Sequence, residues 1–233
     1  MGVINNKQEI NTTSKDIYES FNHFIFSNDT KVLSKLMFKY KFLELTKEVP
    51  GDVLELGVFK GSGLLGWLKL KDIFYPNSFK KIVGFDIFDT DKLISILDGY
   101  DREYMENLFV SRGFKQSPQY VDILSQKILD AGFSHSDFEL VAGDVSYTTK
   151  AYASERPGAK ISILYIDLDL DKPTYDSLVN LWQRVSSGGY IVFDEYGYHQ
   201  WSETNGADRF AKEHGLKIYP LDCQSPTAYI KKD

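Results

Sequence analysis

The sequence has a single cysteine, no surplus of basic residues and no long apolar run. That cysteine, Cys223, excludes an internal disulfide and a zinc cluster of thiolates, and it fits a reducing compartment. The net charge of −6 offers no basic surface to a phosphate backbone, which argues against a nucleic-acid partner. No stretch approaches the roughly 18 apolar residues of a membrane span, and the N-terminus lacks the apolar core of a signal peptide. We therefore expect a cytoplasmic protein without a membrane partner.

What is present is an alternation of strand and helix patterns. The length of 233 residues suits one α/β domain with additional helices. Short strands are expected over residues 52–57, 81–86, 138–142, 161–166, 190–193, 216–220 and 227–231. Helical spacing of apolar residues fills most of the gaps and is clearest over 173–185. The alternation predicts a Rossmann-like α/β fold: a mostly parallel, seven-stranded sheet with helices on both faces and ligands at the carboxyl ends of the strands.

Two segments outside this alternation are expected to have roles of their own. Residues 1–50 should form an N-terminal arm and a helix over 31–48 capped by Thr30, and could act as a lid or an oligomer contact. Residues 51–233 should form the main domain. Within it, residues 87–118 are too long for a simple connection, so we expect helices there that build part of a substrate pocket.

The first strand runs into a glycine loop with the sequence ELGVFKGSG. Glycines there allow a tight turn and a close approach of the backbone to a ligand at the next helix N-terminus. Counted from Gly57, the first glycine of the loop, the spacing is G-x-x-x-G-x-G and not the G-x-G-x-x-G of dinucleotide folds. The loop is not a phosphate-binding P-loop either, because no Gly-Lys-Ser/Thr closes it. The acid before the first glycine suits a positively charged ligand such as S-adenosylmethionine, which has an ammonium and a sulfonium. The candidate cofactor-binding residues in this loop are Glu55, Gly57, Val58, Gly61, Ser62 and Gly63.

Further acids follow the next strands. Asp86 ends the second strand, where a carboxylate can accept both ribose hydroxyls. Asp144 follows the third strand and could face the adenine side of the pocket, and Asp167 follows the fourth. Any one of these acids could be an ordinary solvated loop residue, but the recurrence at strand ends favours a cofactor site that includes all three.

An acidic cluster is expected where the fourth and fifth strands end. Asp167 and Asp169 follow one strand and Asp194 and Glu195 follow the other, and these strands are expected to be neighbours. Several buried carboxylates repel one another unless a cation or protons neutralise them. Oxygen-only ligands favour Mg²⁺ or another hard divalent cation over zinc. The pattern therefore predicts a metal site on Asp167, Asp194 and Glu195.

These acids suggest a reaction at a hydroxyl group. A metal at the cluster would make a bound hydroxyl more acidic, and Asp169 would take its proton. The oxygen would then attack the sulfonium methyl in line, with proximity supplying much of the rate. His199 is a rival base, since its ordinary pKa suits neutral pH, although a surface or substrate-contact role is favoured for it.

With these motifs in view, the chain resembles the macrocin/TylF-type O-methyltransferases, which include the aminocoumarin sugar methyltransferases. The matching stretches are LELGVFKGSG, VGFDIFDT, AGD, LYIDLDLDKPTYDSL and SGGYIVFDEYG, spanning roughly residues 52–197, with a weaker match over 205–210. The resemblance implies a class I methyltransferase fold, S-adenosylmethionine and Mg²⁺, with the metal on Asp167, Asp194 and Glu195 and Asp169 as base. It also implies a sugar hydroxyl as acceptor and a homo-oligomer. Where the family commonly has Asp-Asp, this chain has Asp194-Glu195, and the longer glutamate side chain reaches further than an aspartate.

Three other functions compete with a sugar O-methyltransferase. A methyltransferase could act on a hydroxylated small molecule other than a sugar. A nicotinamide or nucleotide-sugar oxidoreductase on a similar sheet would need a G-x-G-x-x-G loop that starts at the first glycine after the strand, usually with a Tyr-x-x-x-Lys pair. The glycine pattern that starts at Gly57 is a different one, since the string GSGLLG begins only at residue 61, and the sequence has no Tyr-x-x-x-Lys pair. A non-catalytic binding module would be expected to lose Asp169 or the metal acids, and all of them are present.

Overall fold

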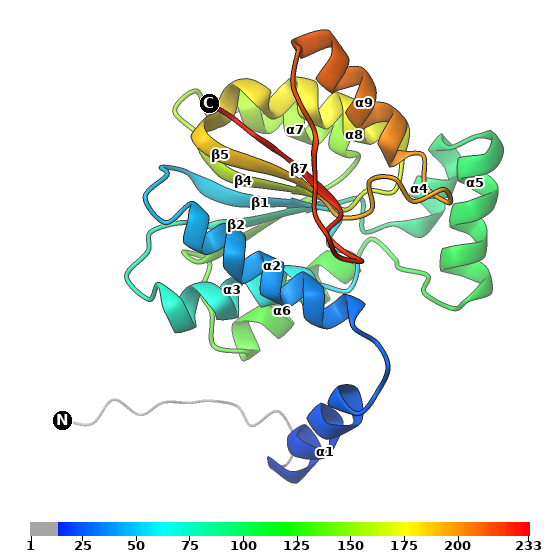
Figure 1. Cartoon of the computed structure of the whole chain (residues 1–233). Coiled ribbons are helices and arrows are strands. Elements are labelled where there is room, and N and C mark those ends of the chain that lie inside the picture. Colours follow the sequence, from blue (N-terminus) through cyan, green and yellow to red (C-terminus); the bar gives the residue numbers. More distant parts are fainter. Residues whose placement is uncertain (1–13) are drawn as a thin grey trace.

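Seven strands form one sheet in the order β3-β2-β1-β4-β5-β7-β6 in the computed structural model, which describes residues 14–233 (Figure 1). The strands are β1 (Asp52–Leu56), β2 (Ile82–Asp86), β3 (Phe138–Ala142), β4 (Ile161–Ile166), β5 (Val185–Phe193), β6 (Tyr219–Pro220) and β7 (Ala228–Lys231). The first five strands are parallel, whereas β7 runs antiparallel to both β5 and β6. The predicted mostly parallel, seven-stranded sheet is confirmed.

Helices cover both faces of the sheet. One face carries α2 (Lys31–Leu45), α3 (Ser62–Phe74) and α6 (Tyr120–Asp130), and the other carries α7 (Val145–Glu155), α8 (Asp171–Leu181) and α9 (Glu203–His214) (Figure 1). A short 3₁₀ turn, Trp182–Arg184, leads from α8 into β5. The sequence did not single out α7, whose apolar positions are sparse. Within residues 14–233, no helix combines the length and the apolarity that crossing a bilayer requires.

The core has two layers because successive side chains of a strand point to opposite faces. Leu54 and Leu56 of β1 pack with Leu178 of α8, whereas Val53 packs with Phe42 of α2 and Trp67 of α3. All of these side chains are buried. Helix α2 is therefore part of the core of the sheet domain. Its packing fixes the position of its polar side chains, which include Lys31, Lys35 and Lys39, near the ends of the strands.

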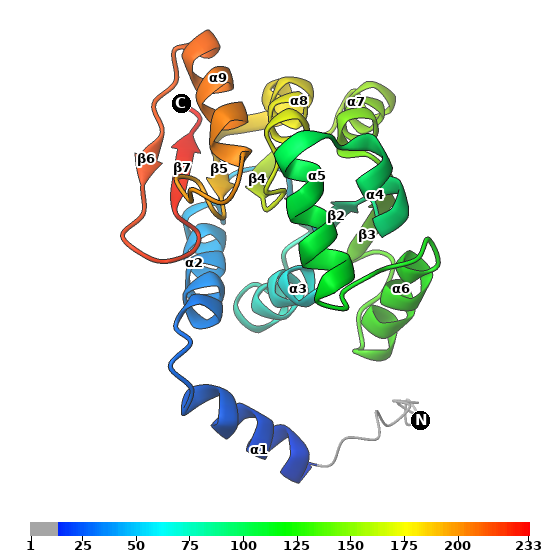
Figure 2. The same cartoon turned by 90° about the vertical axis from the view of Figure 1, so that its right-hand side faces the viewer.

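The N-terminal segment is helical where the structure describes it. Helix α1 (Ser14–Ile25) extends away from the sheet domain and has no buried residue (Figures 1 and 2), while residues 1–13 of the expected arm lie outside the described residues. The predicted cap of α2 was wrong. Thr30 makes no capping hydrogen bond, and Asp29 Oδ1 instead accepts the backbone N–H of Lys31 at 2.8 Å and of Val32 at 3.3 Å.

The long segment after β2 carries helices, as its length suggested. They are α4 (Thr90–Ile96), α5 (Gly99–Met105) and a π-helical turn over Glu106–Ser111. Figure 2 shows α4 and α5 in front of the end of the sheet, close to β2 and β4. This places the segment over the carboxyl edge of the sheet, where ligands of parallel sheets bind.

Candidate active site

A cleft of about 550 Å³ lies at the carboxyl edge of the sheet. Its walls come from the loops after β1, β2, β3 and β4 and from the segment that carries α4 and α5. Eight of the nine predicted cofactor residues line it, namely Glu55, Gly57, Val58, Ser62, Gly63, Asp86, Asp144 and Asp167. The segment over residues 87–118 contributes apolar side chains to the wall of the cleft, including Ile96, Met105 and Phe109. Polar and apolar walls thus meet in one cavity large enough for a small ligand.

The glycine loop brings backbone into positions that a side chain would block. Gly57 has φ +91°, and a Cβ there would lie 1.8 Å from the backbone oxygen of Asp167. A Cβ on Gly63 would lie 2.2 Å from Oε1 of Glu55. The remaining predicted loop residue, Gly61, does not line the cleft, and a Cβ on it would meet Leu124 of α6 at 2.3 Å. These glycines let the loop pack closely against its own surroundings, while the close approach to a ligand that the sequence pattern suggested stays a prediction.

Asp86 orders the glycine loop from the end of β2. Its Oδ2 accepts the backbone N–H groups of Val58 and Phe59, each at 2.8 Å, and its Oδ1 accepts that of Phe88 at 2.9 Å. Burial raises the pKa of Asp86, and the same backbone N–H groups act in the opposite direction. The carboxylate therefore holds the loop after β1 and the loop after β2 together. The predicted hydrogen bonds to ribose hydroxyls would come in addition to these contacts.

Two further predicted cofactor residues have partners within the chain. Asp144 caps α7, because its Oδ1 accepts the N–H of Ser146 at 2.9 Å. Glu55 pairs with Lys39 of α2 at 3.2 Å, and both side chains are buried, at 3% and 2% exposed. The negative charge of Glu55 is thus already matched by a lysine, which weakens the argument that this acid marks a cationic ligand.

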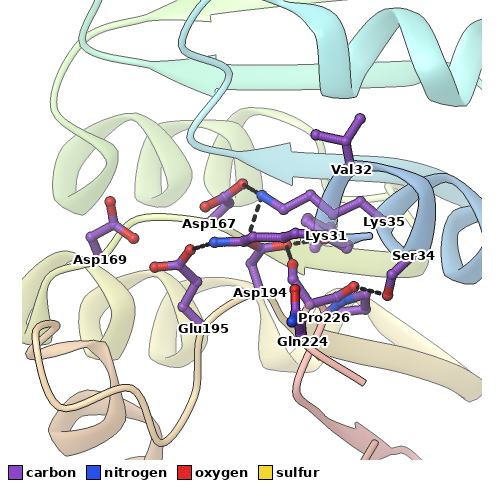
Figure 3. A network of polar contacts seen from close by, with 12 residues as sticks. Lys31, Val32, Ser34, Lys35, Asp167, Asp169, Asp194, Glu195, Gln224 and Pro226 are labelled. Carbon is purple, nitrogen blue, oxygen red and sulfur yellow. Dashed lines mark hydrogen bonds and ion pairs between the residues drawn. The ribbon is translucent and has the colours of Figure 1, made fainter. Parts of the chain in front are cut away.

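The predicted acidic cluster forms, but lysines of α2 lie on it (Figure 3). Lys35 Nζ lies 3.2 Å from Oδ2 of Asp167 and 2.6 Å from Oδ2 of Asp194. Lys31 forms an ion pair with Oε1 of Glu195. Burial, and then the charge of Asp194, raises the pKa of Asp167 to about 7, and Lys35 opposes that shift. The chain itself therefore supplies the positive charge that the acids require.

This arrangement does not fit the predicted divalent cation. Of the three predicted ligands only Asp167 lines the cleft, and the Asp194 side chain is fully buried. Oδ1 of Asp194 accepts hydroxyl hydrogen bonds from Tyr165 and, at 2.6 Å, from Ser225. Within residues 14–233, no three His, Cys, Asp or Glu side chains are arranged to hold a metal ion. A cation such as Mg²⁺ demands near-octahedral oxygen ligands, and the lysines already pair with one oxygen of each of the three predicted ligands.

Asp169 faces the cleft on a strained turn. Its φ is +65°, a left-handed conformation that non-glycine residues adopt rarely. Glu203 of α9 stabilises this turn, since its Oε2 accepts the N–H groups of Leu168 and Asp169 at 3.3 Å. Burial, followed by the charges of Asp167 and Glu195, raises the pKa of Asp169 well above its usual range. A cation in the cleft would therefore favour its charged, proton-accepting form.

Within the described chain, the Asp169 carboxyl also has an oxygen, Oδ1, that is buried and has no hydrogen-bond partner. Such an unpaired buried acceptor is costly unless a ligand supplies a donor. His199, the rival base, is exposed and does not line the cleft. The geometry thus supports Asp169 over His199 as the group that meets a bound hydroxyl.

Sequence reasoning missed four charged residues of this site. Glu203 carried no signal, because an acid in the first turn of a helix is common. Lys31, Lys35 and Lys39 did carry one, since they recur every four residues and so share one face of α2. Three lysines on one helix face and a cluster of acids at the ends of the strands could have been predicted to form ion pairs with each other.

The sheet order, the antiparallel β7 and the cleft at the carboxyl edge define the class I methyltransferase fold. Residues 42–225 match the family described as macrocin-O-methyltransferase (TylF), so the chain belongs to that family. The resemblance seen in the sequence motifs and the predicted fold are both confirmed.

Solved structures and curated relatives agree with this assignment. The chain is similar to CalS11, a calicheamicin methyltransferase, with a TM-score of 0.75, 22% identity, and coverage of 97% of this chain and 88% of that chain. It is similar to the O-methyltransferase NovP with a TM-score of 0.63 and 20% identity, over 84% of this chain and 78% of that chain. It is also 26% identical over 161 residues to demethyldecarbamoylnovobiocin O-methyltransferase of Streptomyces niveus, which covers 64% of this chain and 53% of that protein. The chain thus spans about half the length of the curated relatives it matches.

Proposed function

We propose that this protein is an O-methyltransferase that transfers the methyl group of S-adenosylmethionine to a hydroxyl of a sugar. The observation that carries this proposal is Asp169, a buried carboxyl with an unpaired oxygen on the wall of the same cleft as the glycine loop. One cavity can therefore hold a methyl donor beside Gly57 and an acceptor hydroxyl beside Asp169.

The cofactor half of the cleft supports a nucleoside ligand. Gly57 and Gly63 line the cleft, as do Asp86 and Asp144 at the ends of β2 and β3. When bound, S-adenosylmethionine supplies a methyl group whose carbon–sulfur bond breaks with both electrons passing to sulfur. The family to which the chain belongs is named for O-methyl transfer.

The chain's own part in the reaction is proton transfer and orientation. Asp169 receives the proton that the acceptor hydroxyl gives up as its oxygen bonds to the methyl carbon, leaving a methyl ether and a protonated carboxyl. Glu203 is a positioning residue, since it holds the 168–169 turn through backbone N–H groups. Residues of the segment 87–118, among them Leu93, Met105 and Phe109, line the cleft and would shield the reacting atoms from water.

A sugar acceptor is inferred from the relatives. One is named for demethyldecarbamoylnovobiocin, and a second, 23% identical over 158 residues, for a rhamnosyl-tetracenomycin 4'-hydroxyl. The cleft wall of Ile96, Met105 and Phe109 suits a sugar that carries apolar substituents or a deoxygenated carbon. A hydroxylated acceptor that is not a sugar is the second candidate, favoured by the same apolar wall.

Metal dependence, which the family resemblance implies, is not part of this mechanism. Lys31 and Lys35 already neutralise the carboxylates that would bind Mg²⁺. The homo-oligomeric state and the cytoplasmic location expected from the sequence both stay predictions.

The test is a screen of the purified protein with S-adenosylmethionine against sugars, nucleotide sugars and glycosylated natural products, with methyl gain read by mass spectrometry. On the best acceptor, Asp169→Asn should lower kcat by at least about 100-fold while the affinity for S-adenosylhomocysteine is unchanged. Asp171→Asn is the matched control, since that carboxylate pairs with Arg209 outside the cleft and its variant should keep activity. Full turnover in Asp169→Asn would remove the base from this mechanism.

A further inference from the structure

Helix α2 presents three lysines to the functional edge of the sheet. Lys31, Lys35 and Lys39 lie at intervals of four residues, so they share one face of the helix. Each reaches a different acid: Lys31 pairs with Glu195, Lys35 with Asp167 and Asp194, and Lys39 with Glu55. One helix face therefore neutralises acids that follow or belong to three separate strands.

Lys35 sits where two of the predicted metal ligands come closest. Its ammonium contacts one oxygen of each, at 3.2 Å for Asp167 and 2.6 Å for Asp194, and the lysine side chain is 26% exposed (Figure 3). A magnesium ion would need those same two oxygens at about 2.1 Å. An ammonium and a divalent cation on the same oxygens repel strongly in a buried setting, so only one of them can be there.

The second oxygen of Asp194 also has partners, whereas within the described residues Oε2 of Glu195 is buried without a hydrogen-bond partner. Asp194 accepts two hydroxyl hydrogen bonds at Oδ1, from Tyr165 and Ser225, in addition to the Lys35 contact at Oδ2. Glu195 is paired with Lys31, whose ammonium also lies 5.5 Å from the ring centre of Tyr198. The carboxylate group of Asp194 is therefore satisfied without any metal.

Packing holds the lysines in place. Lys39 lies between the rings of Trp67 and Tyr165, at 4.4 and 4.1 Å from their centres, and forms a buried ion pair with Glu55. One turn earlier, Ser34 Oγ donates to the backbone oxygen of Ser225 at 2.5 Å. These contacts hold the first turns of α2, and with them Lys31 and Lys35, beside the cluster.

We propose that Lys35, supported by Lys31, takes the place of a divalent cation in this protein, and that methyl transfer proceeds without a metal. Lys35 lines the cleft together with Asp167 and Asp169, whereas Lys31 does not. Lys35 forms ion pairs with two carboxylates, and its ammonium has three N–H groups, so one of them can be donated to an acceptor oxygen next to the base that takes the proton. Its catalytic part rests on the proposed function, but its part in excluding metal does not.

The direct test is metal binding, with Mn²⁺ alone as the probe and its free concentration read by electron paramagnetic resonance. The wild-type protein should bind no stoichiometric Mn²⁺ at micromolar concentrations. Lys35→Met removes the charge and keeps the length of the side chain, so it should bind Mn²⁺ at least about 10-fold more tightly than the wild type. Lys41→Met, on the exposed side of the same helix, is the matched control and should behave as the wild type.

The second readout is methyl transfer on the best acceptor. Activity should be unchanged by EDTA and by added Mg²⁺, Lys35→Met should lose at least about 100-fold in kcat, and Lys35→Arg should recover part of it. Stoichiometric micromolar Mn²⁺ binding by the wild type, or loss of activity in EDTA that Mg²⁺ restores, would overturn the proposal. Should Lys35→Met fail to fold, the wild-type titration still decides. Failure of methyl transfer to every acceptor would count against the proposed function alone, because the Mn²⁺ titration needs no acceptor.

Discussion

Lys35 Nζ lies 2.6 Å from Asp194 Oδ2 and joins the first half of α2 to the end of β5. The Asp194 side chain is fully buried, and its second oxygen accepts the hydroxyl groups of Tyr165 and Ser225. A carboxylate with this set of partners acts as a structural anchor.

Removal of Asp194 should therefore destabilise the fold. Asp194→Ala leaves an ammonium and two buried hydroxyl groups without their acceptor, so we expect a loss of about 3 kcal/mol in the free energy of unfolding, measured by urea titration. Asp208→Ala, which removes one exposed hydrogen bond from Tyr196, should cost less than about 1 kcal/mol. If Asp194 were instead an unneutralised metal ligand, its removal would relieve repulsion and raise the stability of the metal-free protein.

The glycine loop should tolerate no side chain at Gly57. A Cβ at that position would lie 1.8 Å from the backbone oxygen of Asp167, so Gly57→Ala should abolish binding of S-adenosylhomocysteine and lower the melting temperature. Gly197 is the control that distinguishes a steric clash from backbone strain. Its φ of +86° is similar to that of Gly57, but no atom lies within 4 Å of its Cβ position. Gly197→Ala should cost only about 1–2 kcal/mol and leave cofactor affinity unchanged. Equal effects of the two substitutions would contradict the close packing of the loop.

Asp86 should act on cofactor affinity through the loop it orders. Asp86→Asn replaces one acceptor oxygen by an NH₂ group, so at least one of the N–H groups of Val58, Phe59 and Phe88 loses its partner. We expect the Kd for S-adenosylhomocysteine to rise by roughly 10- to 100-fold in calorimetry. Asp89→Asn, which alters a helix cap that asparagine serves equally well, should bind as the wild type does. An unchanged Kd in Asp86→Asn would remove this residue from the cofactor site.

The ion pair of Arg156 with Glu139, on the edge strand β3, should make the free energy of unfolding weakly dependent on pH. Arg156 holds Glu139 of β3 with two hydrogen bonds, at 2.6 and 3.0 Å, and thereby lowers the pKa of that carboxyl. A lowered pKa in the folded state gives stability that is present above the unfolded pKa of about 4.3 and is lost as the pH falls through the folded pKa. Glu139→Gln should thus cost less than about 1 kcal/mol at pH 7, because the pair is partly exposed to water, and that difference should shrink toward pH 3. The urea midpoints of the wild type and of Glu139→Gln should be compared at each pH. A difference between them that grows on acidification would contradict a lowered pKa of Glu139 in the folded state.

The sheet and its acidic edge could be predicted because they follow from short-range patterns. Alternating strands and helices indicated a parallel sheet, and the carboxyl ends of parallel strands meet at one edge, so Asp167 and Asp194 had to be near each other. The glycine loop was predictable for the same reason, since its signal lies within one strand and the following turn.

The partners of those acids could not be predicted from local patterns. Lys35 is 132 residues from Asp167 in the sequence, and the docking of α2 depends on the packing of Phe42 against the whole sheet. The left-handed turn at Asp169 depends in turn on Glu203, 34 residues further on in another helix. Charge patterns that are complementary only after folding leave no trace in hydrophobic periodicity.

The central claim is that this cleft binds S-adenosylmethionine for methyl transfer. Separate calorimetric titrations with S-adenosylmethionine and with NADH, the cofactor of the alternative oxidoreductase function, test it most directly. We predict one site per chain with a Kd in the micromolar range for S-adenosylmethionine, no binding of NADH, and loss of the signal in Gly57→Ala. Binding of NADH without binding of S-adenosylmethionine or S-adenosylhomocysteine would contradict the assignment of this cleft to methyl transfer.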